Sequence, residues 1–134
     1  MFELKGRVIK GEGVGRTIGY PTANLDRRYS NRHPVPDGVW ACAVKVESRK
    51  SKVHKVVGKR KWYKGVAVIG MRDKRRGGKK VEIYLLDFKK NIYGRHLEVV
   101  LVKRLRKLKK FNTVPELVRQ VKNDIACARR IMVR

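Results

Sequence analysis

The segment Gly38-Val39-Trp40-Ala41-Cys42-Ala43-Val44-Lys45-Val46 is the clearest predicted strand in this chain of 134 residues. Near its start, apolar side chains occupy both sets of alternating positions rather than one. Alternate residues of a strand point to opposite faces, so this pattern is typical of a strand that is covered on each side. We therefore expect the segment to run through the core of a β structure.

Four further segments predict strands on either side of it. Phe2–Ile9 alternates between apolar and polar residues, and Gly65–Gly70 is a short apolar run between two glycines. Lys80–Phe88 and Ile92–Leu105 are predicted strands joined by the polar turn Lys89-Lys90-Asn91. The spacing indicates short strands connected by turns, with no helices alternating between them.

The end of the chain predicts one helix. Thr113-Val114-Pro115-Glu116 has the form of a capping box, with Thr113 at the N-cap, Glu116 three residues later and a proline in the first turn. Apolar residues then recur at helical spacing: Leu117, Val121, Ile125, Ala128 and Met132. Many short strands followed by one terminal helix predict a mainly β fold, an antiparallel barrel or sandwich against which the helix packs one face.

Polar and cationic segments separate the predicted strands. Asp26–Asp37, which contains two prolines, is expected to cross the surface without regular structure. Ser48–Lys64 is the most cationic segment and is expected to form a projecting hairpin. Trp62 and Tyr63, at the end of that hairpin, either stack on nucleic-acid bases or lead into the next strand.

A glycine-rich run follows the first predicted strand: Gly11-Glu12-Gly13-Val14-Gly15-Arg16-Thr17-Ile18-Gly19. Glycines let the backbone turn sharply and bring its N–H groups close to an anion. Arg16 adds a positive charge, so we interpret Gly11, Gly13, Gly15 and Arg16 as a phosphate-binding loop. The spacing fits neither the P-loop nor the dinucleotide fingerprint, and the alternative is an ordinary loop between strands.

The residues after this loop, Tyr20-Pro21-Thr22-Ala23-Asn24, place two oxygen-bearing side chains close together. Pro21 fixes one backbone angle and favours extended geometry at the residue before it. In an extended segment Thr22 and Asn24 point the same way, and their neutral oxygens suit Mg²⁺, whose coordination is completed by water and substrate phosphate. Alternatively, both residues satisfy their own backbone in a turn.

Several blocks of the sequence resemble the riboflavin kinase family, whose members convert riboflavin to FMN and are often fused to an FAD synthetase. The blocks occur in the family's order over most of the chain: Gly19-Tyr20-Pro21-Thr22-Ala23-Asn24-Leu25, Pro36-Asp37-Gly38-Val39-Trp40-Ala41, Val81-Glu82-Ile83-Tyr84-Leu85-Leu86-Asp87-Phe88, Ile92-Tyr93-Gly94, Leu105-Arg106 and Lys110-Phe111. The resemblance implies one kinase domain over 1–134, folded as a six-stranded antiparallel Greek-key barrel with a C-terminal helix. It also implies Mg²⁺-dependent transfer of phosphate from ATP to riboflavin.

Glu82 lies in an apolar strand of a chain with only 11 acidic residues, so its place there needs a reason. From the residues alone, it either faces an opening or forms a salt bridge with a lysine on a neighbouring strand. The resemblance implies that Glu82 is the catalytic base at the 5′-hydroxyl of riboflavin. It further implies nucleotide contacts from the glycine loop, Thr22 and Asn24, and flavin contacts from Tyr93 and Arg106. The alternative for Arg106, which belongs to a basic run, is a solvated surface.

The sequence departs from the family pattern at two places. After Gly70, where many relatives have Pro-Thr, this chain has Met71-Arg72-Asp73-Lys74. The turn before Tyr93, which is usually acidic, is Lys89-Lys90-Asn91. Both changes concern the expected rim of the flavin site, and neither touches the proposed metal ligands or base.

The charge of the chain points to a second class of function. The 36 Lys and Arg residues against 11 Asp and Glu give a net charge of +25, which suits a polyanionic partner such as RNA. The alternative to a kinase is therefore a basic β-barrel that binds RNA or ribosomes, and a third interpretation is an inactive barrel that holds flavin. RNA binding gives no use to Glu82, so this acid together with Thr22 and Asn24 distinguishes the two main hypotheses.

Length, apolar runs and cysteines bound the setting of the protein. The length suits one domain with its own core. No apolar run is long enough to span a membrane and the first residues lack a signal-peptide core, so we expect a cytoplasmic monomer. FAD synthesis is not expected, because no nucleotidyltransferase sequence precedes the kinase blocks. Cys42 and Cys127 are expected to be buried, reduced thiols.

Overall fold

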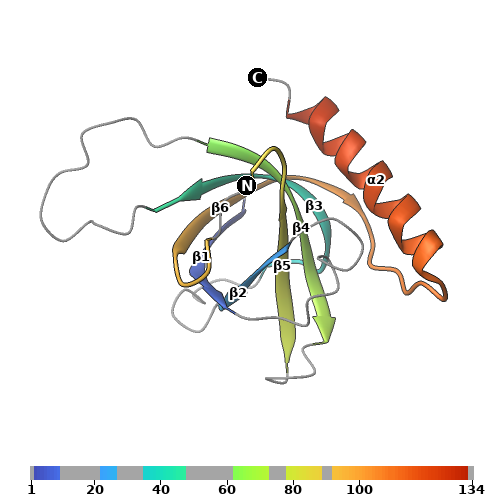
Figure 1. Ribbon diagram of the computed structural model, residues 1–134, viewed down its shortest axis with the longest axis horizontal. Coiled ribbons are helices and arrows are strands. Elements are labelled where there is room, and N and C mark those ends of the chain that lie inside the picture. The colour runs from blue at the N-terminus through green and yellow to red at the C-terminus, as the bar shows by residue number, and fades with distance from the viewer. Residues whose placement is uncertain are drawn as a thin grey trace, which may run out of the picture.

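The computed structural model describes residues 2–9, 22–26, 35–47, 62–72, 78–88 and 92–132. These residues form six strands and a helix, namely β1 (Phe2–Ile9), β2 (Thr22–Asp26), β3 (Gly38–Val46), β4 (Trp62–Arg72), β5 (Lys79–Leu85), β6 (His96–Arg106) and α2 (Val114–Ile131). The strands close into an antiparallel barrel in the order β1-β2-β5-β4-β3-β6 (Figure 1). Strands β3, β4 and β5 are neighbours in turn and β6 returns to lie beside β3, which is a Greek-key arrangement. The predicted fold class is confirmed.

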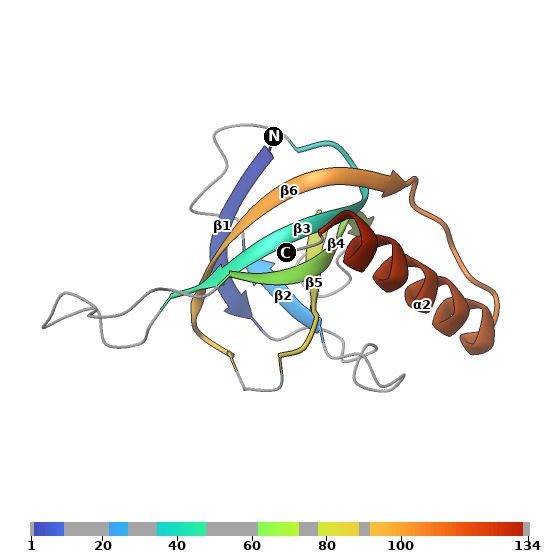
Figure 2. The same ribbon diagram turned by 90° about the horizontal axis from the view of Figure 1, so that it is seen from above.

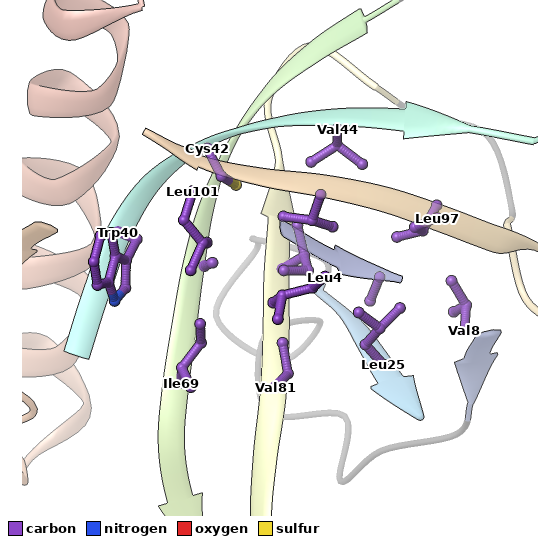
Figure 3. Close-up of a cluster of buried hydrophobic side chains, with 14 of the residues drawn as sticks. Leu4, Val8, Leu25, Trp40, Cys42, Val44, Ile69, Val81, Leu97 and Leu101 are labelled. Atoms are coloured by element: carbon purple, nitrogen blue, oxygen red, sulfur yellow. The ribbon is translucent and has the colours of Figure 1, made fainter. Parts of the chain in front are cut away.

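Side chains from all six strands fill the interior of the barrel (Figure 3). The labelled members of this core are Leu4, Val8, Leu25, Trp40, Cys42, Val44, Ile69, Val81, Leu97 and Leu101. Burying an aliphatic side chain of this size contributes about 1.5–3 kcal/mol, so the interior is the main source of stability. Small barrels are filled by their own side chains in this way, which directs the search for a ligand site to the outer surface.

The two cysteines are both free. Cys42 is buried in the barrel, and burial raises the pKa of its thiol above the ordinary range. Cys127, on α2, is only half-buried. The expectation of buried thiols is therefore correct for Cys42 and wrong for Cys127.

Helix α2 covers part of the outer side of the barrel (Figure 2). Val39 and Ala41 of β3 are buried there in a cluster with Ala128 of the helix. At the alternate positions, Trp40 and Cys42 fill the barrel interior. The start of β3 is therefore buried on both faces, and the prediction of a strand covered on each side is confirmed.

The helix begins as its sequence predicts. Thr113 is the N-cap, and its hydroxyl oxygen accepts a hydrogen bond from the backbone N–H of Glu116 at 3.3 Å. Pro115 lies in the first turn, where a backbone N–H has no partner within the helix and its loss costs little.

Within the part of the chain that the structure describes, no helix combines the length and the apolar character needed to cross a membrane.

Two ion pairs of opposite polarity fasten α2 to the barrel. Arg106, at the end of β6, donates to the carboxylate of Asp124 from Nε at 3.0 Å and from Nη2 at 2.9 Å. Near the end of the helix, Arg129 donates to the carboxylate of Asp87 at 2.8 and 3.1 Å. Asp87 has a φ of 57°, a left-handed conformation that residues other than glycine seldom adopt. The barrel thus supplies the cation of one pair and the anion of the other.

Some boundaries differ from the prediction. Thr22–Asp26 forms a complete strand, where the sequence indicated only a stiff, extended segment. Strand β4 starts at Trp62, so Trp62 and Tyr63 lead into the strand and do not stand on the predicted hairpin. Strand β5 ends at Leu85 and β6 starts at His96, because the chain turns between them through residues with positive φ.

Four predicted features lie wholly or mostly outside the described residues. They are the phosphate-binding loop with Gly11, Gly13, Gly15 and Arg16, most of the irregular segment 26–37, most of the cationic segment 48–64, and the turn 89–91. The described part of the candidate site therefore lies on the strands and on α2.

Candidate active site

Strands β2 and β5 bring two distant sequence blocks side by side. They pair antiparallel, with Asn24 opposite Glu82 and Thr22 opposite Tyr84. The Cβ atoms of directly opposed residues lie about 4.5–5.5 Å apart. The residues at alternate positions fill the barrel interior, namely Ala23, Leu25, Val81 and Ile83. The side chains of Thr22, Asn24, Glu82 and Tyr84 therefore share one patch of the outer surface.

Glu82 is half-buried and has a lysine partner. The ammonium nitrogen of Lys80 lies 3.4 Å from Oε1 of Glu82, and the two side chains are 15% and 16% exposed. The sequence left open a salt bridge to a lysine on a neighbouring strand. The observed lysine is on the same strand, two residues earlier, because residues i and i+2 of a strand share a face.

Tyr84 occupies the border between this patch and the helix. Its ring packs against the apolar cluster beneath α2. Burial, followed by the charges of Glu82 and Asp124, raises the pKa of Tyr84 to about 12, while Arg106 acts in the opposite direction. At neutral pH Tyr84 therefore keeps its proton, and it lies within electrostatic reach of Glu82, Asp124 and Arg106.

The Arg106–Asp124 pair is held by further hydrogen bonds within the protein. Asp124 is 5% exposed and also accepts a hydrogen bond from the side-chain amide of Gln120 at 3.0 Å. Arg106 uses Nη1 to donate to the carbonyl oxygen of Lys107 at 3.0 Å. A guanidinium has five N–H donors, so these three bonds leave two for other acceptors. Arg106 is thus held in place and still able to bind an anion.

The structure does not bring Tyr93 to the same place as Arg106. Tyr93 precedes the start of β6 and is 55% exposed, whereas Arg106 is the last residue of that strand. An extended strand of this length spans about 33 Å, so the two residues predicted to contact flavin lie at opposite ends of β6. The Tyr93-Gly94 motif has a structural use: Gly94 has a φ of 82° and its N–H donates to the carbonyl oxygen of Val8 at 3.0 Å.

The donor set on β2 and β5 fits a divalent cation that prefers hard oxygen ligands. Thr22 offers a hydroxyl oxygen and Asn24 an amide oxygen from the same face of β2, beside the carboxylate of Glu82. Mg²⁺ is commonly bound by one or two protein oxygens, with water and substrate phosphate completing the shell. Thr22 and Asn24 are the residues that would hold it.

Three residues of this region were not predicted from the sequence: Lys80, Tyr84 and Asp124. Asp124 gave a usable signal, because it lies three residues after Val121 and four before Ala128, on the apolar face of the predicted helix. A carboxylate on a buried helix face requires a partner, as Glu82 does on its strand. The partnership of Lys80 with Glu82 gave no signal, since a lysine at the start of a strand is ordinarily solvated.

Known proteins resemble this chain over nearly its whole length. The family model described as Flavokinase, riboflavin kinase, matches residues 1–132. The chain is 38% identical over 129 residues to the bifunctional riboflavin kinase/FMN adenylyltransferase of Escherichia coli strain K12. The aligned region covers 96% of this chain and 37% of that protein. It is 30% identical over 129 residues to the RNA-binding riboflavin kinase RibR of Bacillus subtilis strain 168, in an alignment that covers 95% of this chain and 50% of that protein. The chain thus spans half or less of the length of these two relatives.

Two solved structures have the same architecture. A crystal structure from Streptococcus pneumoniae, described as a macrolide-efflux protein, superposes with a TM-score of 0.74 at 34% identity, over 95% of this chain and 38% of that one. The riboflavin kinase of Trypanosoma brucei superposes with a TM-score of 0.67 at 23% identity, over 97% of this chain and 76% of that one, which shows a shared fold. With the family model matched from residue 1 to residue 132, the chain belongs to the riboflavin kinase family.

Proposed function

We propose that this chain transfers the γ-phosphate of ATP to the 5′-hydroxyl of riboflavin and releases FMN and ADP. The observation that carries the proposal is the position of Glu82 directly opposite Asn24, with Thr22 on the same face of β2. An acid, a hydroxyl and an amide oxygen from separate sequence blocks meet on one patch. Family membership supports this reading of the patch.

For phosphoryl transfer, the protein has mainly to position the reactants and to stabilise charge. The oxygen of the riboflavin hydroxyl bonds to the γ-phosphorus as the bond from that phosphorus to the β–γ bridging oxygen breaks, and ADP leaves. The carboxylate of Glu82 orients the hydroxyl and accepts its proton. Because Glu82 is half-buried, its carboxylate acts in a medium where charge interactions are stronger than in water.

Thr22 and Asn24 would hold Mg²⁺ against the phosphates. When bound, the metal would supply positive charge to the phosphate oxygens. Such electrostatic stabilisation makes the largest contribution to catalysis of phosphoryl transfer. The protein's own contribution is geometric, since two ligands on a strand of a closed barrel are fixed by the pairing of that strand with β1 and β5. The glycine loop with Gly11, Gly13, Gly15 and Arg16 is proposed to cover the nucleotide phosphates.

Arg106 is proposed as the flavin-side residue. It is linked to Glu82 across Tyr84, because the ring of Tyr84 lies within the electrostatic reach of both. Its two remaining N–H donors suit the phosphate of the product or the polar edge of the flavin. Tyr93, beyond the other end of β6, is proposed as a second flavin contact.

A riboflavin-dependent assay of FMN formation tests the proposal. Glu82→Ala is expected to lower kcat by about 100- to 10,000-fold, the range for loss of a general base. Glu98→Ala is a matched control, since Glu98 is also a strand glutamate paired with lysines on the outer surface, at 3.4 Å from Lys5 and 2.9 Å from Lys45. Activity that is absent from the wild-type protein, or that survives in Glu82→Ala, would refute the proposed function.

Nucleic-acid binding is a second candidate, favoured by one cationic segment. Five exposed cations at the end of β6 and in the connection to α2 have no carboxylate partner among the described residues: Lys103, Arg104, Lys107, Lys109 and Lys110. Such a segment suits a phosphate backbone. One relative in the family is named as RNA-binding.

Salt dependence separates this candidate from nonspecific attraction. We expect the logarithm of the affinity for a single-stranded RNA to fall with the logarithm of the salt concentration, with a slope of about −0.7 for each phosphate contact. The triple variant Lys107→Ala, Lys109→Ala, Lys110→Ala should reduce that slope by about two units. An unchanged slope would remove this segment as the binding surface.

A further inference from the structure

Four outward side chains, which we call the Trp62 row, cross the neighbouring strands β1, β6, β3 and β4. Glu98 of β6 pairs with Lys5 of β1 on one side and with Lys45 of β3 on the other. Lys45 is in turn opposite Trp62, the first residue of β4. The residues that precede the first three of them fill the barrel interior: Leu4, Leu97 and Val44. Because alternate residues of a strand point to opposite faces, the row lies on the outer surface.

Trp62 presents a large aromatic ring on this surface. The residue is 48% exposed, and the ammonium nitrogen of Lys45 lies 5.0 Å from the centroid of its ring, a cation–π contact. Lys45 is itself fixed by Glu98, with 2.9 Å between the ammonium nitrogen and the carboxylate. A ring that is already held loses less conformational freedom when a planar group stacks on it, which favours binding.

The next residue, Tyr63, shows how an aromatic residue at this end of the barrel is used for packing. Its side chain points to the opposite face from that of Trp62, and its ring meets that of Phe88 edge-on, with 4.7 Å between the ring centroids. Phe88 packs against the interior of the barrel. Trp62, by contrast, is in neither of the two apolar clusters that the described residues form. Its ring is therefore available to a ligand.

The charge around Trp62 is positive. The Trp62 row holds two lysines and one acid, and Lys64, two residues after Trp62 on the same face of β4, adds a third lysine. Strands β3 and β4 end and begin beside this row, and the sequence that joins them carries seven cations and no acid over residues 48–61: Arg49, Lys50, Lys52, Lys55, Lys59, Arg60 and Lys61. These charges complement a ligand that is anionic and has planar groups.

The Trp62 row is separate from the candidate active site and from the cationic segment that starts at Lys103. Glu82 is opposite Val68 on β4, and Trp62 precedes Val68 by six residues, which is about 20 Å along an extended strand. On β6, Lys103 follows the row's Glu98 by five residues, or about 17 Å. A ligand on Trp62 thus occupies a different surface from the proposed substrates.

We propose that the ring of Trp62 stacks on a base of single-stranded nucleic acid, while the surrounding lysines attract its phosphates. A nucleobase offers a flat π face and its backbone carries negative charge, so both properties of this surface are used. Every base has such a face, and the binding is therefore largely independent of sequence. This inference does not depend on the kinase function, and it shares with the second candidate function only the class of partner.

Tryptophan fluorescence provides the test, because the chain has two tryptophans and the other, Trp40, is only 7% exposed. An oligoadenylate of about ten nucleotides should quench the emission of the wild-type protein. Trp62→Phe should abolish the quenching and change the affinity less than about threefold. Trp62→Ala should lower the affinity about 5- to 100-fold, as for the loss of one stacked base. Val114→Ala removes a side chain that is also exposed, at the start of α2, and should change neither quantity.

Anions without bases separate stacking from charge. Trp62→Ala should bind inorganic polyphosphate and polyglutamate as tightly as the wild-type protein does. An oligoadenylate that does not bind or does not quench overturns the proposal, and so does an equal loss of affinity for polyphosphate. An equal loss for polyglutamate also overturns it and would assign the surface to an acidic peptide.

Two further measurements keep the test independent of folding and of the kinase function. Urea unfolding of each variant detects misfolding, and if Trp62→Ala does not fold, Trp62→Leu and Trp62→Phe carry the same comparison. A wild-type protein that forms no FMN refutes the kinase function alone, because the quenching by oligoadenylate is still measurable. Quenching that persists in Trp62→Phe would place the base elsewhere and overturn the inference.

Discussion

The outer surface of this barrel has two regions that start from the same strand geometry and end differently. Over β3 and β4, the outward positions are apolar and are covered by α2, with Val39, Ala41 and Val66 buried. Over β2 and β5, the outward positions carry Thr22, Asn24, Glu82 and Tyr84, and of these four only Tyr84 belongs to the cluster beneath α2. The two regions thus differ in what covers them: the helix covers the apolar region, and the proposed site lies on the polar region.

The ionic contacts of the two regions also differ, in the distance between the charged groups and in the burial of the carboxylate. Beneath α2, Arg106 and Asp124 form two bonds of 3.0 and 2.9 Å, with Asp124 almost fully buried. On the β2–β5 region, Lys80 and Glu82 are 3.4 Å apart. The bonds beneath α2 are close to the length of a strong charge-assisted hydrogen bond, whereas the contact between Lys80 and Glu82 is longer.

Loss of the buried pair should have the largest effect on stability. Asp124→Ala leaves Arg106, which is 22% exposed, without its carboxylate. We expect the free energy of unfolding in urea to fall by roughly 3 kcal/mol, the lower end of the range for removing one partner of a buried pair. Asp87→Ala removes the exposed partner of Arg129 and should cost less than about 1 kcal/mol. Equal losses in the two variants would contradict the distinction between the regions.

A change on the β2–β5 region should instead affect activity at nearly constant stability. Asn24→Ala removes a proposed metal ligand, and even the outer partners of metal ligands are worth about 10–100-fold in metal affinity. We expect the Mg²⁺ concentration needed for half-maximal FMN formation to rise at least about tenfold, with partial recovery at high Mg²⁺. Asn123→Ala, on the exposed side of α2, is the matched control and should behave as wild type.

Tyr84 tests the border between the regions through its titration. Its pKa is raised to about 12, so the folded protein holds this proton above the ordinary value near 10. The resulting stabilisation is fully present below pH 10 and is lost as the pH rises from about 10 to about 12. Ultraviolet difference titration should show a late-ionising tyrosine in the wild-type protein and none in Tyr84→Phe. A wild-type curve in which all tyrosines ionise near pH 10 would place Tyr84 in solvent.

The smallest effect is expected at Glu98, which belongs to neither region. Its hydrogen bond from Lys45 and its proximity to Lys5 hold the pKa of Glu98 below the ordinary value of 4.5. A lowered pKa means that the stabilisation is present at neutral pH and is lost as the pH falls through the pKa of the folded state. Glu98→Gln should therefore cost less than about 1 kcal/mol at pH 7, and nothing at a pH where Glu98 is protonated. A constant difference at all pH values would show that packing is responsible, not charge.

Local patterns predicted most of the fold, because they depend on neighbouring residues. Alternation in Gly38–Val46 and the cap at Thr113 give strand β3 and the start of α2 with their observed bounds. Strand β2 has only five residues and was not identified as a strand from its own sequence. Its conformation depends on pairing with β1 and β5, which is a property of the folded chain.

The site was predictable where a residue type conflicts with its surroundings. Glu82 in an apolar strand attracted attention, and the family resemblance then connected it with Thr22 and Asn24. Partners chosen by tertiary packing could not be predicted: Lys80 for Glu82, and Asp124 for Arg106. Tyr93 was grouped with Arg106 through motif membership, yet the two lie at opposite ends of β6.

The alternation along β2 has a consequence for how the proposed activity can be lost. Ala23 and Leu25 face the barrel interior, and Thr22 and Asn24 face outward, so a slip of one residue against β5 would turn the strand inside out. A substitution at Leu25, which lies in the barrel interior, can thereby displace the two proposed metal ligands. The buried residues of β2 thus determine the orientation of the proposed ligands, and a mutational screen restricted to ligand-contacting residues would overlook them.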